Sequence, residues 1–180
     1  EIGFQKNKVV LINDTRTYFM KIIFLGDICA TSPLYGIDPR YFRIISDANC
    51  IIANFEGVFS ERCREDIVYN SLSTIDTLNI LKVNSVILGN NHIFDDKKLF
   101  KNTVNILNES GIDSFGAGVN LLEAQRPFVA DSGDQKALVY SFGWNVIGCK
   151  QASTNVSGVN PFEIKNLFTT INNYRIGDKH

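Results

Sequence analysis

The sequence predicts an α/β fold in which a largely parallel sheet is covered by helices. Short apolar runs alternate with segments of helical periodicity, and three of the runs end abruptly in glycine or polar residues. Buried parallel strands end in this way, and such alternation is typical of sheets whose ligands lie beyond the carboxyl ends of the strands. With 180 residues, 44% hydrophobic and 21% charged, the chain is long enough to bury a sizeable core.

The strands are expected where short apolar runs occur, at residues 20–25, 50–53 and 85–88. A further apolar run at residues 137–142 predicts a later strand. Residues 8–12 are apolar and β-branched and predict a short strand or arm. We therefore divide the chain into an N-terminal arm or upstream segment, residues 1–19, and a domain that begins at residue 20.

Four helices are expected between and after these strands. Asp38 followed by Pro39 supplies an N-cap and a first-turn proline. Ser73 with Asp76 three residues later resembles a capping box, and Gly111 is a stop signal for the helix before it. The helices are predicted at residues 40–46, from about 74, from about 97 to 110, and at 161–171.

Composition removes several classes of function. The formal net charge is -1 and the pI is near 6.2, so we expect no nucleic-acid partner, because nucleic acids recruit clustered Lys and Arg. The four cysteines form no CxxC pair, which argues against a zinc knuckle or a disulfide framework. No apolar stretch is long enough to span a bilayer and no leader is visible, so we expect no membrane segment in this chain and a cytoplasmic location.

Polar side chains follow all three of the first strands. Asp27 follows the first strand, Asn54 and Glu56 the second, and Asn91 and His92 the third. Carboxylate and amide oxygens together with imidazole nitrogen suit Mn, Fe, Zn or Mg. Any one of these residues is commonplace at a strand end, but their recurrence at three equivalent ends predicts one shared site.

Four segments of the chain carry a recognisable series of motifs. They are FLGDI at residues 24–28, ANFEG at 53–57, LGNNHIFD at 88–95 and GIDSFGAGVNLLEAQRP at 111–127. In order and spacing they resemble the motifs of the bacterial capsule-synthesis CapA family, which is also linked to poly-γ-glutamate synthesis and belongs to the calcineurin-like metallophosphoesterase superfamily. The resemblance implies a four-layer α/β/β/α sandwich, of which residues 20–180 would form the N-terminal portion.

The resemblance also implies a role for each site residue. His92 would face the scissile group and stabilise charge or protonate a leaving oxygen, and Asp95 would orient it. A complete site would hold two divalent ions, which generate a hydroxide nucleophile and spread the charge of a phosphoryl transition state. The residues expected to bind metal are Asp27, Glu56, Asn91 and, as a ligand or a supporting amide, Asn54.

The chain departs from the family pattern in two places. Asp96 and Lys97 stand where the family usually has Tyr-Gly, and the HWG-like and GHxPH-like segments that supply later histidine ligands are absent. The only other histidine is His180. We therefore expect an open half-site that binds Mn or Zn weakly or not at all, completed by a C-terminal half or by another chain, with homo-oligomerisation as one route.

Three functions remain open at this point. The first is a metal-dependent hydrolase of phosphoesterase type in capsule or poly-γ-glutamate biosynthesis, acting on a phosphoester or an anionic polymer. The second is a non-catalytic accessory or polymer-binding protein of capsule assembly with an incomplete metal site. The third is a doubly wound nucleotide-binding domain, which residues 116–118 suggest but which lacks GxGxxG after the first strand.

Overall fold

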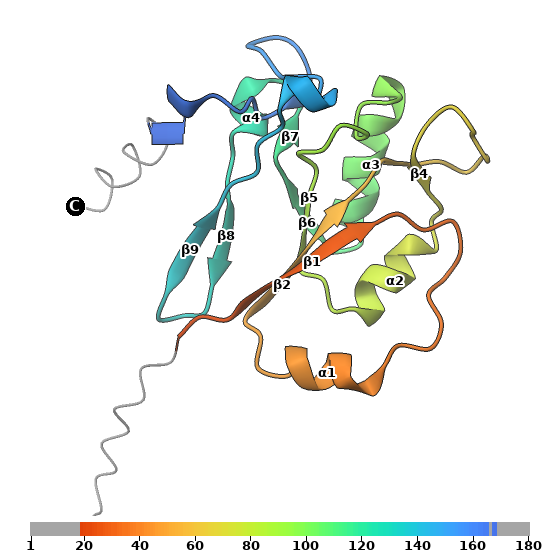
Figure 1. The fold of residues 1–180 in the computed structure, drawn as a ribbon, viewed down its shortest axis with the longest axis vertical. Helices are drawn as coiled ribbons and strands as arrows, with labels where there is room; N and C mark the ends of the chain where they lie inside the picture. Colours follow the sequence, from red (N-terminus) through yellow and green to blue (C-terminus); the bar gives the residue numbers. More distant parts are fainter. Residues whose placement is uncertain (1–18, 166, 169–180) are drawn as a thin grey trace, which may run out of the picture.

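A four-stranded parallel sheet forms the centre of the protein in the computed structural model, which describes residues 19–165, 167 and 168 (Figure 1). The strand order is β1-β2-β5-β6, and every neighbouring pair is parallel. The strands are β1 (Ile22–Ile28), β2 (Cys50–Phe55), β5 (Ser85–Ile87) and β6 (Asp113–Phe115). The predicted α/β class and the three predicted strands are confirmed.

The central strand β2 is buried on both faces. Ile51, Ala53 and Phe55 pack into the larger core, whereas Cys50 and Ile52 pack into a second cluster on the opposite face. This alternation is the two-residue period of a strand. Because both faces are covered, the strand reads in the sequence as a continuous apolar run.

Helices cover one face of the sheet. They are α1 (Pro39–Ile45), α2 (Thr74–Ile80) and α3 (Lys97–Glu109), and all three contribute to the larger core. The predicted caps of two helices are confirmed: the Asp38 carboxylate accepts a hydrogen bond from the Arg40 amide, and Gly111, with φ of +74°, follows the end of α3. The capping box at Ser73 is wrong, because Ser73 is already αR and its hydroxyl bonds to Ser71 instead.

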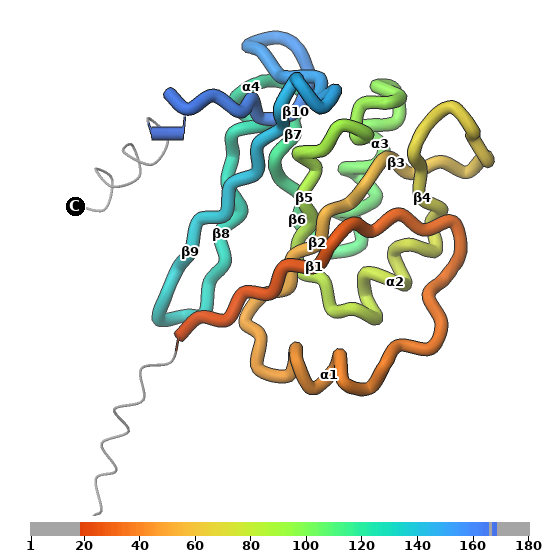
Figure 2. Tube along the Cα trace, viewed as in Figure 1, coloured from red at the N-terminus to blue at the C-terminus, as the bar shows by residue number. Residues whose placement is uncertain are grey.

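A β-hairpin lies against the other face of the sheet. It consists of β8 (Phe128–Asp131) and β9 (Lys136–Val139), which pair antiparallel, and it packs on the second cluster around Ile52 and Phe115 (Figure 2). Phe24, in the first half of β1, is left 57% exposed. The described residues thus form a helix layer, a parallel sheet and a hairpin on the opposite face of the sheet, which is consistent with an α/β sandwich.

Several short elements surround the carboxyl edge of the sheet. They are β3 (Val58–Phe59), β4 (Tyr69–Asn70), β7 (Ala117–Gly118), α4 (Leu121–Ala124), the 3-10 helix η1 (Asn145–Ile147) and β10 (Gly158–Val159). Of the predicted helix at 161–171, residues 164, 165, 167 and 168 are helical, and residues beyond 168 lie outside the described part, as does the predicted arm at 8–12. None of the helices that the structure describes combines the length and apolarity needed to cross a bilayer.

Candidate metal and catalytic site

The predicted site residues lie where three parallel strands end on the same edge of the sheet. Asp27 in β1 and Asn54 in β2 are direct register partners, and Glu56 follows β2 at once. The register of β1 shifts between Phe24 and Asp27, an irregularity that coincides with Gly26. The shift places Asp27 opposite Asn54 and so brings its side chain to the site.

The amide of Asn54 joins the two carboxylates. Its Nδ2 donates hydrogen bonds to Asp27 Oδ1 at 2.8 Å and to Glu56 Oε2 at 2.5 Å. The second oxygen of each carboxylate accepts no hydrogen bond from a described residue. Asn54 is therefore a supporting amide in this structure, and Asp27 and Glu56 each keep one oxygen for a ligand.

His92 and Asp95 form a hydrogen-bonded pair on the loop after β5. Asp95 Oδ2 lies 2.8 Å from His92 Nδ1 and also accepts the Val68 amide at 3.1 Å. Because an ionised carboxylate can only accept, this contact keeps the Nδ1 proton in place and turns Nε2 toward the site. Nε2 is 4.0 Å from Glu56 Oε1, too far for a hydrogen bond.

The neighbouring asparagines differ in their contacts. Asn90 is 7% exposed; its Oδ1 accepts the His92 and Ile93 amides, and its Nδ2 donates to the Phe55 carbonyl at 2.8 Å. Sequence reasoning missed this loop-fixing residue and selected Asn91, which is half-buried and makes no side-chain hydrogen bond to a described residue. Among the described contacts, Asn90 is thus the asparagine that holds the loop, and the ligand role of Asn91 stays a prediction.

Sequence reasoning also missed a second asparagine, Asn70 in β4. Its side chain is fully buried, donates to the Glu56 carbonyl at 2.7 Å and accepts the Ala30 amide at 2.9 Å. It therefore ties the loop after β1 to the turn after β2.

The electrostatics of the site follow from burial and from crowded negative charge. Burial raises the pKa of Glu56, and the nearby charges of Asp27 and Asp95 add to this, while the hydrogen bond from Asn54 and the charge on His92 oppose it. Burial and the charge of Glu56 likewise raise the pKa of the Cys29 thiol, which donates to the Tyr69 carbonyl. Cys29 is therefore held as a thiol rather than a thiolate ligand.

The donor types suit a hard divalent cation. Asp27, Glu56 and Asn91 offer carboxylate and amide oxygens, and the crowded negative charge at Glu56 is of the kind that a cation relieves. Within residues 19–165, 167 and 168, however, no group of three or more His, Cys, Asp or Glu side chains is arranged to hold an ion. The donor atoms of Asp27, Glu56 and Asn91 thus fit a divalent cation in kind.

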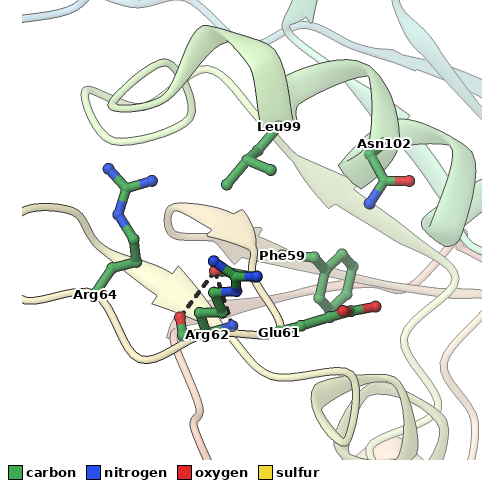
Figure 3. A pocket seen from close by; sticks show the side chains of 7 residues that line it. Phe59, Glu61, Arg62, Arg64, Leu99 and Asn102 are labelled. Carbon is green, nitrogen blue, oxygen red and sulfur yellow. Dashed lines mark hydrogen bonds between the residues drawn. The ribbon is translucent and has the colours of Figure 1, made fainter.

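A hollow lies between the β3–β4 loop and α3, and none of the predicted site residues lines it (Figure 3). Phe59 and Leu99 provide apolar lining, and Arg62 and Asn102 provide polar groups. Arg64, which Figure 3 shows pointing away from Phe59 and Glu61, pairs with Asp66 at 2.6 Å and with Asp96 at 2.9 Å. This clasp fixes the loop to the start of α3, one residue beyond Asp95.

Fold and site together define the class of protein: an α/β protein with carboxylate, amide and imidazole groups gathered at the carboxyl edge of a parallel sheet. The particular family follows from comparison with known families. The model of the bacterial capsule synthesis protein family PGA_cap matches residues 21–171, and the chain belongs to this family. A comparison with curated proteins gives no match. Membership confirms the CapA resemblance, implies the calcineurin-like superfamily and associates the chain with capsule synthesis.

Proposed function

We propose that this chain forms part of a divalent-metal-dependent hydrolase of phosphoesterase type that works in capsule synthesis. The observation that carries the proposal is the connected arrangement at one sheet edge. Asn54 links Asp27 to Glu56, and Glu56 faces the His92 imidazole across 4.0 Å. Family membership supports the setting in capsule synthesis.

The cation would be held by one oxygen each of Asp27, Glu56 and Asn91. When bound, such an ion polarises a phosphoryl oxygen and lowers the pKa of a bound water. Burial is the main cause that raises the pKa of Glu56, and the negative charges of Asp27 and Asp95 add to it. Ion binding would therefore displace any proton from Glu56 and relieve the repulsion between Glu56 and Asp27.

His92 would act at its Nε2 atom. The hydrogen bond to Asp95 orients the ring, as in other His and carboxylate pairs. Asn90 holds the backbone at His92, so the ring is carried by a fixed loop. A protonated Nε2 can then give its proton to a leaving oxygen in the space beside Glu56.

A non-catalytic, polymer-binding role in capsule assembly is the second candidate. The observation that favours it is that the described residues hold no cluster of three or more metal-binding His, Cys, Asp or Glu side chains. Under this proposal, the same edge of the sheet would bind polymer without cleaving it.

Calorimetric titration of the chain with Mn²⁺ tests the proposal. We expect a dissociation constant on the order of 10⁻⁴ to 10⁻³ M, typical of a weak oxygen-ligand site. Asp27→Asn and Glu56→Gln keep the side-chain shape and should weaken binding about tenfold or more. The matched control is Asp113→Asn, because Asp113 is an exposed carboxylate at the opposite, amino end of the sheet.

Two outcomes separate the candidates. Equal Mn²⁺ affinity in wild type and Asp27→Asn would overturn the metal site. Site-specific Mn²⁺ binding without hydrolysis of an aryl phosphate would favour the polymer-binding role.

A further inference from the structure

One short segment contacts the loops that follow all three site-bearing strands. We infer that residues 68–70, here called the brace, set the positions of these loops relative to one another, and that Val68 and Asn70 are positioning residues for the site. The inference rests on the proposed function for its meaning, but the contacts that carry it do not depend on metal or substrate.

The first contact of the brace is to the His92 loop. The Val68 amide donates to Asp95 Oδ2, the same oxygen that bonds His92 Nδ1. A carboxylate oxygen held by two donors has a more defined direction than one held by the imidazole alone. The orientation of His92 is therefore coupled to where the Val68 backbone lies.

The second contact is to the turn that carries Glu56. Gly57 has φ of +85°, and a Cβ placed on it would lie 2.2 Å from the Val68 carbonyl oxygen, which the Val58 amide bonds at 3.3 Å. Only glycine allows both this conformation and this approach. Two residues further on, the side-chain Nδ2 of Asn70 donates to the Glu56 backbone carbonyl at 2.7 Å.

The third contact is to the loop after β1. Asn70 Oδ1 accepts the Ala30 amide at 2.9 Å, and the Ser71 amide donates to the Ala30 carbonyl at 2.9 Å. Ala30 lies three residues beyond Asp27. A displaced brace would therefore move the carboxylates of Asp27 and Glu56 and the His92 ring together.

The brace contributes little to a β-sheet, because β4 pairs with β3 over only two residues. The fully buried Asn70 side chain instead forms hydrogen bonds mainly with the site loops. A buried amide with both ends bonded is costly to disturb, because loss of one partner leaves a desolvated polar group. This makes Asn70 a fixed reference point between β1 and β2.

The first test replaces Gly57 by Ala, which pushes on the Val68 carbonyl. Gly111→Ala is the matched control, because Gly111 also has a positive φ of +74° but has open space around its Cβ position. The readout is the imidazole ¹⁵N and Nδ1–H spectrum of His92 at a pH where the ring is neutral; the chain has only one other histidine, His180, so assignment is direct. Gly57→Ala should speed exchange of Nδ1–H about fivefold, the effect of losing about 1 kcal/mol, and Gly111→Ala should not.

The second test replaces Asn70 by Asp and keeps the inference decidable if Gly57→Ala does not fold. The Asn70→Asp change removes the side-chain N–H group that donates to the Glu56 carbonyl. The control is Asn84→Asp, which keeps the side-chain oxygen that accepts the Ile51 backbone amide. The readout is the side-chain NH₂ signal of Asn54, which reports the relative position of the two carboxylates it bonds. Asn70→Asp should shift this signal toward that of a free amide, and Asn84→Asp should leave it in place.

The inference is overturned if both variants fold, Gly57→Ala keeps the wild-type His92 signal and Asn70→Asp keeps the wild-type Asn54 signal. If only Asn70→Asp folds, a wild-type Asn54 signal in that variant overturns the inference. Both readouts are taken without metal or substrate. Equal Mn²⁺ affinity in wild type and Asp27→Asn would therefore overturn the metal site while leaving the outcome for the brace intact.

Discussion

Replacing Asn54 by Asp is the sharpest single perturbation of the site. Asn54 Nδ2 donates to Asp27 and to Glu56, and an aspartate there would turn both hydrogen bonds into contacts between like charges. The change alters almost no volume, so packing is conserved. We expect a less stable metal-free protein whose stability is restored by a divalent cation.

The magnitude follows from the two contacts. Hydrogen bonds to charged groups contribute about 1.5–3 kcal/mol each, and the Asp27 contact is discounted because Asp27 is exposed. Glu56, with its side chain 16% exposed, provides most of the loss. We expect the free energy of unfolding to fall by about 2–3 kcal/mol, which lowers Tm by roughly 4–12 °C for a domain of this size.

The assay is urea and thermal unfolding at pH 7 in the presence of a chelator. Asn120→Asp is the control: Asn120 caps α4 by accepting the Glu123 amide, and aspartate caps equally well, so stability should change by less than about 0.5 kcal/mol.

The pKa of Glu56 is raised, so its ionised form opposes folding above the ordinary carboxyl pKa, and this opposition disappears as the pH falls. The gap between wild type and Asn54→Asp should therefore close in acid. Equal stability of Asn54→Asp and Asn120→Asp at pH 7 would refute the reasoning.

Three further predictions follow from other contacts. Glu56→Gln should raise the stability of the metal-free chain at pH 7 by on the order of 1 kcal/mol, seen as a higher Tm, because it removes a partly desolvated charge whose pKa is raised; a lower Tm would contradict this. Thr103→Val should cost about 1–3 kcal/mol in urea unfolding, because the fully buried Thr103 hydroxyl accepts the Phe59 amide; Thr103→Ser, which keeps the hydroxyl, is the comparison. Arg64 lowers the pKa of Asp66 to about 2, so the clasp stabilises the loop above the ordinary carboxyl pKa and is lost as the pH falls toward 2; a ¹³C carboxyl titration of Asp66 near its ordinary pKa would show that the clasp does not form in solution.

The sequence alone was sufficient to predict the strands and helix ends that are determined by residues close to them in the chain. β2 and β5 are buried on both faces, so they appear as continuous apolar runs, and the polar residues directly after them mark the edge where ligands lie. Asp38 and Gly111 act through the backbone of their own helix ends, so their caps could be predicted. The helix layer and the position of Asp27, Glu56 and His92 follow from these signals.

The remaining features depend on partners that are distant in sequence. The two-residue strands β3 and β4 are too short for any periodicity, and the partners of Asn70, which include Ala30 and Glu56, cannot be read from its neighbours. Asn90 and Asn91 are adjacent and chemically identical. Only the fold shows that Asn90 is the buried one, so its role in holding the loop could not be predicted from the sequence.

The central claim is that a divalent cation binds at the carboxyl edge of the sheet, and paramagnetic broadening by Mn²⁺ tests it most directly. In a ¹H–¹⁵N spectrum titrated with substoichiometric Mn²⁺, the amide signals of residues 27–29, 54–57 and 90–92 should broaden first, and Asp27→Asn should remove the effect. Broadening centred instead on Asp131 and Asp134, the exposed carboxylates of the β8–β9 hairpin, with the site amides unchanged, would contradict the account.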